Sequence, residues 1–236
     1  MSGRPLAGAV VLVTGANGGL GREFVEQALE RGAAKVYASA RTPRRWHDAR
    51  VVPLTLDVTD PASIAAAAAL ASDVTLVVNN AGASNGATVM DDGPALRDLF
   101  EVNLFAPLAV VGAFAPAMAR NGGGALVNVL SVLSWLGIGD GYSATKAALW
   151  SATNTQRLAL APDGILVTAL HLGYTDTPMT AGLDVAKNDP ADVVRQAYDG
   201  VESGAYEVLA DDISRQVKAG LAAPVTALYP QLAPAG

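Results

Sequence analysis

The chain has 236 residues, of which 51% are apolar, so it can bury a substantial core and is not an intrinsically disordered chain. Its formal net charge of −6 argues against nucleic acid or an anionic membrane as a partner. It contains no cysteine, which excludes disulfides and thiolate metal sites and leads us to expect a cytoplasmic protein.

Short apolar runs alternate with helical patterns along the chain. The first run, residues 9–13, leads directly into the glycine-rich stretch TGANGGLG at 14–21. Further candidate strands lie at 35–38, 51–54, 74–79, 125–130, 165–171 and 206–209, and candidate helices at 19–31, 61–71, 94–120, 142–161, 190–203 and 211–221. No run predicts a membrane span, and the tail at 223–236, with three prolines, is expected to be irregular.

Continuously apolar strands separated by helices predict the α/β class. We expect one doubly wound, Rossmann-type domain over residues 1–236, with a parallel seven-stranded sheet covered by helices on both faces. A glycine-rich turn between the first strand and the first helix lets backbone N–H groups approach a pyrophosphate. The alternative is an ordinary tight turn, because the spacing is neither G-x-G-x-x-G nor that of a lysine-containing phosphate loop.

Tyr142 and Lys146 lie four positions apart on a predicted helix and therefore share one face. An ammonium group there would lower the pKa of the phenol from about 10 and make it a better proton-transfer group near neutral pH. The alternative is an ordinary helix pair with a solvated lysine.

Five motifs in order make the chain resemble the short-chain dehydrogenase/reductase family. They are the T-G-x-x-x-G-x-G pattern of Thr14, Gly15, Gly19 and Gly21, LDV at 56–58, NNAG at 79–82, VNL around Asn103, and YSATK at 142–146. The resemblance covers residues 10–179 and implies a cofactor half at about 1–120 and catalytic and substrate elements at about 121–236. Gly18 also permits a G-x-x-G-x-x-G reading, typical of the branch that contains epimerases and dehydratases.

The resemblance implies four catalytic residues: Asn103, Ser131, Tyr142 and Lys146. Tyr142 would exchange the proton, Lys146 would also bind the nicotinamide ribose, and Ser131 would hold the substrate oxygen. Asn103 would hold a local irregularity of its helix and a water that links Lys146 to solvent; plain structural roles are the alternative for Asn103 and Ser131. Ser131 precedes Tyr142 by eleven positions, fewer than is usual in the family, so we expect a tight loop and a lesser role for Ser134.

Cofactor choice is predicted at the end of the second strand. Ala40 stands where an acidic residue would select NAD, and Arg41 follows it. An arginine fits a 2′-phosphate, so we expect NADP(H), with a further hydrogen bond from Ser39; a solvated Arg41 is the alternative. The complete set of implied cofactor-binding residues is Gly15, Asn17, Gly18, Gly19, Leu20, Gly21, Ser39, Arg41, Asp57, Val58, Asn79, Ala81, Gly82, Tyr142, Lys146, Gly173, Thr175 and Thr177.

Two stretches depart from the family pattern. HLGYTDTPM at 171–179 has Leu172 in place of the usual proline, and His171 is interpreted as a strand-end residue rather than a catalytic one. YEVLADD at 206–212 replaces a glycine-rich end, which leaves the oligomer interface open.

Together these features predict an NADP(H)-dependent oxidoreductase that transfers hydride between nicotinamide and a carbonyl or alcohol. A carbonyl or keto reductase for a small, mostly apolar substrate, acting as a homodimer or homotetramer without a metal, is the favoured interpretation. The alternatives are a non-catalytic NADP-binding regulator on the same fold, or an epimerase or dehydratase that retains its nicotinamide.

Overall fold

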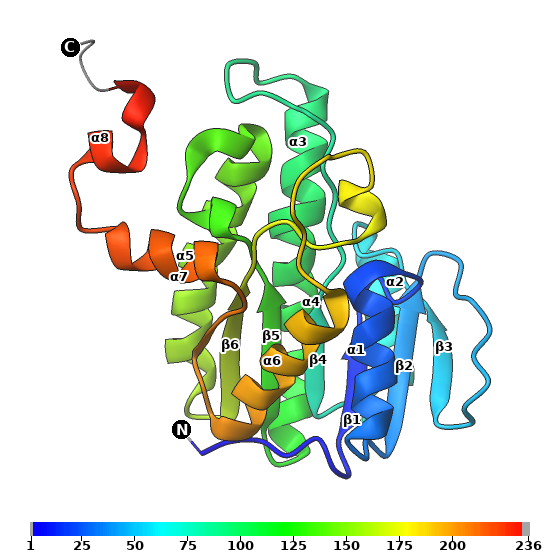
Figure 1. Ribbon diagram of the computed structural model, residues 1–236. Helices are drawn as coiled ribbons and strands as arrows, with labels where there is room; N and C mark the ends of the chain where they lie inside the picture. The colour runs from blue at the N-terminus through cyan, green and yellow to red at the C-terminus, as the bar shows by residue number, and fades with distance from the viewer. Residues whose placement is uncertain (1, 233–236) are drawn as a thin grey trace.

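The computed structural model describes residues 2–232, and its centre is one parallel sheet of seven strands (Figure 1). The strands are β1 (Val10–Val13), β2 (Lys35–Ala40), β3 (Val51–Thr55), β4 (Leu76–Asn79), β5 (Gly124–Val129), β6 (Ile165–His171) and β7 (Glu207–Leu209). Their order is β3-β2-β1-β4-β5-β6-β7, and every neighbouring pair is parallel. The chain thus starts near the middle of the sheet and winds outward in both directions, which confirms the predicted doubly wound fold.

Helices cover both faces of the sheet. They are α1 (Gly19–Glu30), α2 (Pro61–Leu70), α3 (Pro94–Phe100), α4 (Ala106–Arg120), α5 (Gly141–Leu160), α6 (Pro190–Ser203), α7 (Asp212–Gly220) and α8 (Val225–Leu228). Figure 1 shows α1 and α6 in front of the sheet and α4 behind it. On the first face the rings of Phe24 and Tyr198 meet edge-on at 5.4 Å, and on the other face Ile64 and Phe114 belong to one buried cluster.

Local packing moves several element boundaries away from the predicted ones. β2 continues to Ala40 because its pairing with β3 extends to Thr55. The helix expected at 94–120 is continuous but contains a π-helical turn, Glu101–Phe105, between α3 and α4. The prediction of an irregular tail is wrong at Val225–Leu228, which form the short helix α8. The last part of that predicted tail, residues 233–236, lies outside the described residues.

The 27-residue helical stretch Pro94–Arg120 is long and apolar enough to cross a membrane, which corrects the expectation that no run has this length. In the fold, its side chains Leu99, Val110, Phe114 and Met118 are buried. Packing in the core therefore accounts for the apolar composition of this helix.

The turn after β1 requires glycine at three positions, at two of them for the backbone conformation and at one of them for lack of space. Gly15 and Gly19 have φ values of 67° and 54°, in the left-handed region that favours glycine. A Cβ on Gly21 would lie 2.2 Å from the carbonyl oxygen of Gly15. Gly18 is different, since it has extended backbone and a Cβ there would meet no atom within 4 Å.

We expect Gly21→Ala to destabilise the protein without cofactor by about 1–3 kcal/mol, because the methyl group forces the turn apart. Alanine normally favours a helix over glycine, so a loss of stability here would report the steric clash. Urea denaturation would measure it, with Gly18→Ala as the matched control that leaves the unfolding free energy nearly unchanged. Equal stabilities of the two variants would contradict this account.

Candidate active site

Most of the predicted site residues meet at the carboxyl edge of the sheet. The turn 14–21 follows β1, Ala81 and Gly82 follow β4, Ser131 follows β5, and residues 173–177 follow β6. In parallel α/β sheets ligands bind at this edge, where neighbouring connections diverge to opposite faces. The edge between β1 and β4 is such a point, because the sheet winds outward from it.

Thr14 joins the turns after β1 and β4 into one unit. Its hydroxyl donates to the carbonyl oxygen of Val78 at 3.2 Å and accepts from the backbone nitrogens of Asn80 and Ala81, both at 3.0 Å. The side chain of Asn80 returns the contact by donating to the carbonyl oxygens of Thr14 and Gly15. Asn80 was absent from the predicted set, although the NNAG motif contained it.

Two predicted cofactor ligands turn their side chains away from this edge. The amide nitrogen of Asn79 donates to Asn128 Oδ1 at 3.0 Å and to the carbonyl oxygen of Pro107 at 3.3 Å. The buried hydroxyl of Ser39 donates to the carbonyl oxygen of Val13 at 3.0 Å. The expected phosphate bond from Ser39 is therefore wrong for this structure, and the side chain of Asn79 serves packing between strands.

Asn103 lies in the π-helical turn and connects it to two other segments. Its amide nitrogen donates to the carbonyl oxygen of Ala83 at 2.9 Å and to the hydroxyl of Thr145 at 3.1 Å, and its oxygen accepts from the backbone nitrogen of Ala83. The irregularity that the resemblance implied is present at this position. A Cβ on Gly82 would lie 3.2 Å from Asn103 Oδ1 and 3.9 Å from Lys146 Nζ, so glycine keeps the space beside Lys146 open.

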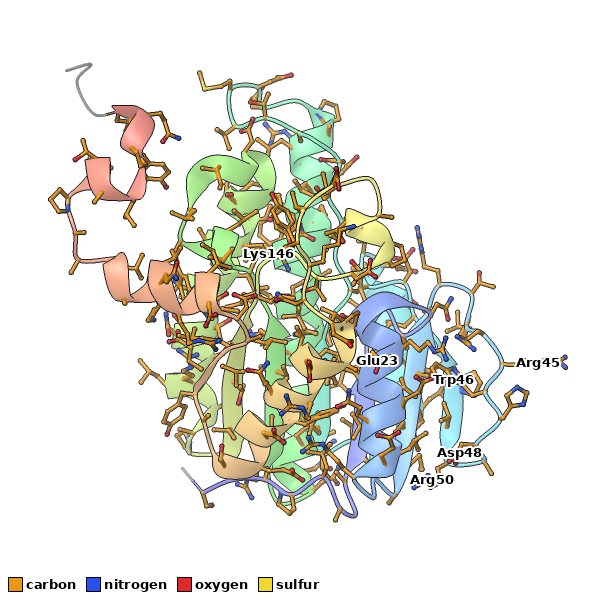
Figure 2. All side chains as sticks on the ribbon, in the orientation of Figure 1. Glu23, Arg45, Trp46, Asp48, Arg50 and Lys146 are labelled. Carbon is orange, nitrogen blue, oxygen red and sulfur yellow. The ribbon has the colours of Figure 1, made fainter. Side chains whose placement is uncertain are left out.

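Tyr142, Lys146 and Ser131 come together between the start of α5 and the end of β5. Lys146 is buried, and its ammonium group donates to the carbonyl oxygen of Val129 at 2.9 Å and lies 5.6 Å from the centre of the Tyr142 ring. Ser131 lies close enough to the phenol of Tyr142 to lower its pKa. Figure 2 shows Lys146 near the middle of the molecule, above the strands.

Burial sets the protonation of this pair. It raises the pKa of Tyr142 to about 12, against a smaller opposing effect of Ser131, and it lowers the pKa of Lys146 to about 8. The expectation that Lys146 lowers the pKa of the phenol is therefore wrong for the protein alone, because the ammonium group faces Val129 and desolvation dominates. Near neutral pH the phenol is neutral and carries the proton that a general acid must donate.

The short loop after β5 gives Ser131 and Ser134 different environments. It opens with a single 3₁₀ turn, Val132–Ser134, in which the hydroxyl of Ser134 accepts from the backbone nitrogen of Ser131 at 3.3 Å. Ser131 Oγ accepts from Leu133 N at 3.1 Å and donates to the carbonyl oxygen of Leu172 at 3.4 Å. Of the two serines, Ser131 is the one that affects the pKa of Tyr142.

The turn after β1 also holds the basic loop after β2. The side chain of Asn17 donates to the carbonyl oxygen of Thr42 at 2.9 Å and accepts from the backbone nitrogen of Arg44 at 3.1 Å. Arg41 is exposed at the start of this loop, directly after β2. Asn17 thus connects the predicted pyrophosphate and 2′-phosphate sites through the backbone.

The other three arginines of residues 41–50, which are Arg44, Arg45 and Arg50, have partners elsewhere or face solvent. Arg50 pairs with Asp48 at 2.7 Å, and Arg44 lies over the ring of Trp46 at 4.8 Å. Figure 2 shows Arg45 pointing away from the body of the protein. Arg41 remains as the arginine next to the end of β2, where the charge of Asp57 lies close enough to be affected by it.

Other predicted cofactor contacts border the same edge. Asp57 accepts two hydrogen bonds from Thr59, which hold the pKa of its carboxyl below the usual range, with a smaller effect of Arg41. Val58 lies beside Ala81 and Thr14 in one narrow cavity, and Leu20 packs against the core. Thr177 lies against Gly19, where a Cβ would be 3.4 Å from its methyl group, while Thr175 is buried.

His171 sits at the end of β6 as part of a buried cluster that sequence reasoning did not find. Its Nδ1 lies 3.1 Å from the carbonyl oxygen of Ser131, and its ring stacks on Trp135 at 3.9 Å. Since a carbonyl only accepts, Nδ1 carries the hydrogen. Its Nε2 lies 3.5 Å from Glu207, whose pKa is lowered to about 2 by the proximity of His171 and by the hydrogen bond from Lys218. The unusual YEVLADD stretch was the signal for this contact.

Comparison with known proteins gives a consistent set of relatives. The profile of the short chain dehydrogenase family matches residues 9–188. Cis-4-hydroxycyclohexanecarboxylate dehydrogenase of Sinomonas cyclohexanicum is 36% identical over 207 residues, covering 81% of this chain and 80% of the relative. The 3-oxoacyl-[acyl-carrier-protein] reductase FabG of Escherichia coli K12 is 31% identical over 214 residues, covering 85% and 86% of the two chains.

Solved structures match over even more of the chain. A short chain dehydrogenase from Burkholderia cenocepacia J2315, solved in complex with NADP, has a TM-score of 0.90 and 37% identity, covering 99% of this chain and 100% of its own. The NADPH-bound carbonyl reductase from chicken fatty liver has a TM-score of 0.76 and 27% identity, covering 86% and 98% of the two chains.

We expect Lys146→Met to change how stability depends on pH. The folded state holds the pKa of Lys146 at about 8, below the ordinary value of 10.5, so the unfolded chain binds more protons between these values. The contribution of this group to the unfolding free energy therefore rises with pH through this window, by up to about 1.4 kcal/mol per pH unit. The variant lacks that contribution.

Urea denaturation of parent and variant across the same window would measure the difference, with Lys187→Met as the control from an exposed loop. Parallel pH profiles for the parent and Lys146→Met would show that burial does not perturb the lysine.

Proposed function

This chain belongs to the short chain dehydrogenase family, and on that premise we propose that it is an NADP(H)-dependent oxidoreductase that reduces a small, mostly apolar ketone or aldehyde. The observation that carries the proposal is the meeting of a neutral phenol, a hydroxyl and a buried ammonium group, of which the ammonium group lies beside Gly82. These three groups are Tyr142, Ser131 and Lys146.

The residues at the carboxyl edge fit a dinucleotide. Gly15 and Gly21 have no room for a side chain, whereas Gly18 has open space beside it, as close approach of a pyrophosphate requires. Asp57 and Val58 would border the adenine, Arg41 the 2′-phosphate, and Ala81, Gly82 and Lys146 the nicotinamide ribose. Gly173, Thr175 and Thr177 would border the nicotinamide. When bound, this cofactor supplies the hydride in reduction and accepts it in oxidation.

The chain's own residues then handle the proton. Tyr142 holds a proton near neutral pH and would donate it to the carbonyl oxygen of the substrate. Ser131 would donate a hydrogen bond to the same oxygen as negative charge develops on it. The ammonium group of Lys146 would stabilise the phenolate that remains, and Asn103 would keep α5 aligned with the π-helical turn through Thr145.

Exposed apolar side chains on the loops around this edge support a mostly apolar substrate. Met90, Ile138, Tyr174 and Met179 are each about half exposed or more, and they lie on the connections after β4, β5 and β6. Asp140, whose carboxylate accepts from the backbone of Val89, adds negative charge to the same loops. We therefore propose that neutral carbonyls, such as cyclohexanone, are better substrates than matched carboxylates, such as 4-oxocyclohexanecarboxylate.

We further propose a cytoplasmic homodimer or homotetramer in which residues 1–236 form one domain. The exposed apolar side chains of Phe105 and Leu158, near α4 and on α5, would suit a subunit contact. Light scattering coupled to size-exclusion chromatography would measure the assembly.

Tyr142→Phe should lower kcat at least about a hundredfold while NADPH affinity stays within about twofold, because only the proton donor is lost. NADPH consumption would be followed with a panel of ketones and aldehydes, and NADPH binding by calorimetry. Tyr37→Phe, on β2 away from the site, is the matched control. A Tyr142→Phe enzyme that keeps most of the parent kcat would contradict the mechanism.

The same assays separate the alternative functions. A parent protein that binds NADPH without consuming it on any substrate would favour the regulator. Isomerisation or dehydration of a substrate without net NADPH consumption would favour the epimerase or dehydratase.

Arg41→Ala should reduce the preference for NADPH over NADH by about ten- to a hundredfold, mainly through KM, because a hydrogen bond to a charged group contributes roughly 1.5–3 kcal/mol. Ala40→Asp combined with Arg41→Ala should go further, since a carboxylate repels the 2′-phosphate. Arg45→Ala, which removes a solvent-facing arginine of the same loop, is the control. Unchanged cofactor discrimination in Arg41→Ala would leave Arg41 as a solvated residue.

A further inference from the structure

Asp211 connects three segments around the proposed site. It is buried, with 9% of its surface exposed, and lies just before α7. One carboxylate oxygen, Oδ2, accepts from the backbone nitrogen of Gly173 and from the side-chain nitrogen of Asn188, both at 2.6 Å. The other, Oδ1, accepts from the backbone nitrogen of Ser214 at 2.8 Å and so caps α7.

The two donors on Oδ2 come from the two ends of one loop. Thr175 and Asn188 form a parallel bridge, in which Asn188 donates to the carbonyl oxygen of Tyr174 at 2.8 Å and accepts from the nitrogen of Asp176 at 3.0 Å. Residues 176–187 therefore form a loop with a closed neck. Asp211 lies outside this loop and binds both sides of its neck. It accepts hydrogen bonds from Gly173, which precedes the bridge, and from Asn188, which is part of the bridge.

This loop lies against the glycine-rich turn. Thr177 and Pro178 are the nearest side chains to the position that a Cβ on Gly19 would take, at 3.4 and 3.6 Å. Figure 1 shows the yellow segment between β6 and α6 arching beside the start of α1. A shift of the neck would therefore move the segment 173–177 relative to the turn.

We propose that Asp211 is a positioning residue that holds the loop 176–187 in place over the cofactor site. The contact between Asp211 and the neck is a property of the fold, whereas its effect on cofactor binding rests on the proposed function. Neither the family profile, which ends at residue 188, nor the site motifs include this residue.

The chemistry of the contact requires a carboxylate. Asparagine has nearly the same shape, but its nitrogen would face the two N–H donors on Oδ2, or, after a flip, the N–H donor on Oδ1. Burial alone would raise the pKa of Asp211, yet the hydrogen bonds from Gly173, Ser214 and Asn188 outweigh burial and hold it below the ordinary value. The side chain is therefore charged near neutral pH, where its hydrogen bonds are strong.

Limited trypsin digestion tests the proposal without requiring turnover. Lys187 is the only Lys or Arg between Arg157 and Arg195, and the nitrogen of the bond that trypsin would cut is the one that Asn188 donates to Tyr174. Cleavage at Lys187 thus requires the neck to open. Mass spectrometry of the full-length protein would follow the appearance of fragments 1–187 and 188–236.

We expect Asp211→Asn to accelerate this cleavage about tenfold or more, as expected for the loss of a hydrogen bond to a charged acceptor. Asp212→Asn is the matched control, because this neighbouring carboxylate is exposed and pairs with Arg215 on its own helix, so the cleavage rate should equal that of the parent. Cleavage of Asp211→Asn at the parent rate, or equal acceleration by Asp212→Asn, would overturn the proposal.

Asn188→Ala tests the role of Asp211 at the neck separately from its role as the cap of α7. It removes one donor to Oδ2 and leaves the hydrogen bond from Ser214 to Oδ1 intact. It should accelerate cleavage at Lys187 by a smaller factor than Asp211→Asn and should raise the KM for NADPH several-fold with little change in kcat. An Asn188→Ala protein cut no faster than the parent would overturn the proposal even if Asp211→Asn fails to fold. Absence of turnover in the parent would instead count against the proposed function, while the cleavage rates still decide the role of Asp211.

Discussion

The hydroxyl of Thr14 is the contact on which the arrangement of the site depends. It has one hydrogen to donate and two lone pairs, and all three are used: one bond to β4 and two from the turn that follows β4. This brings the glycine-rich turn and the NNAG turn so close that a Cβ on Gly15 would lie 3.1 Å from the Cα of Ala81. The close approach of these two turns therefore explains both the crowding at the glycines and the shape of the edge at which a dinucleotide would bind.

Burial without compensation by a nearby charge is the second constraint on the site. The phenol of Tyr142 and the ammonium group of Lys146 are each driven toward the neutral form, since residues 2–232 place no group of opposite charge next to them. A ligand that brings negative charge close to Lys146 would stabilise its ammonium form, so ligand binding and the protonation of Lys146 are coupled in this geometry. Such coupling is common where proton transfer takes place, because a group that titrates near neutral pH can both give and take a proton.

Much of the fold and the grouping of the site could be predicted from the sequence, because both rest on local signals. Apolar runs give the strands, and parallel strands bring the residues after them to one edge. What could not be predicted depends on contacts between distant segments. Whether Ser39 and Asn79 face the edge or a neighbouring strand follows from the register of the sheet. The raised pKa of Tyr142 follows from burial, and the contact between Asp211 and Gly173 joins residues with no motif in common.

The buried pair of Asn79 and Asn128 has a consequence for how the sheet assembles. The two residues are direct partners in the register of β4 and β5, and Asn128 continues to Thr153 and Gln156 on α5. The other residues of β4 are Leu and Val. These side chains are so similar that a shift in register between β4 and β5 would lose little apolar contact. A slip by one residue that pairs Asn79 with Val129 and Asn128 with Val78, however, would leave the amide donors and acceptors of both asparagines without partners in a dry core. The hydrogen bond between the two amides thus specifies the register of two strands whose other side chains would tolerate a shift.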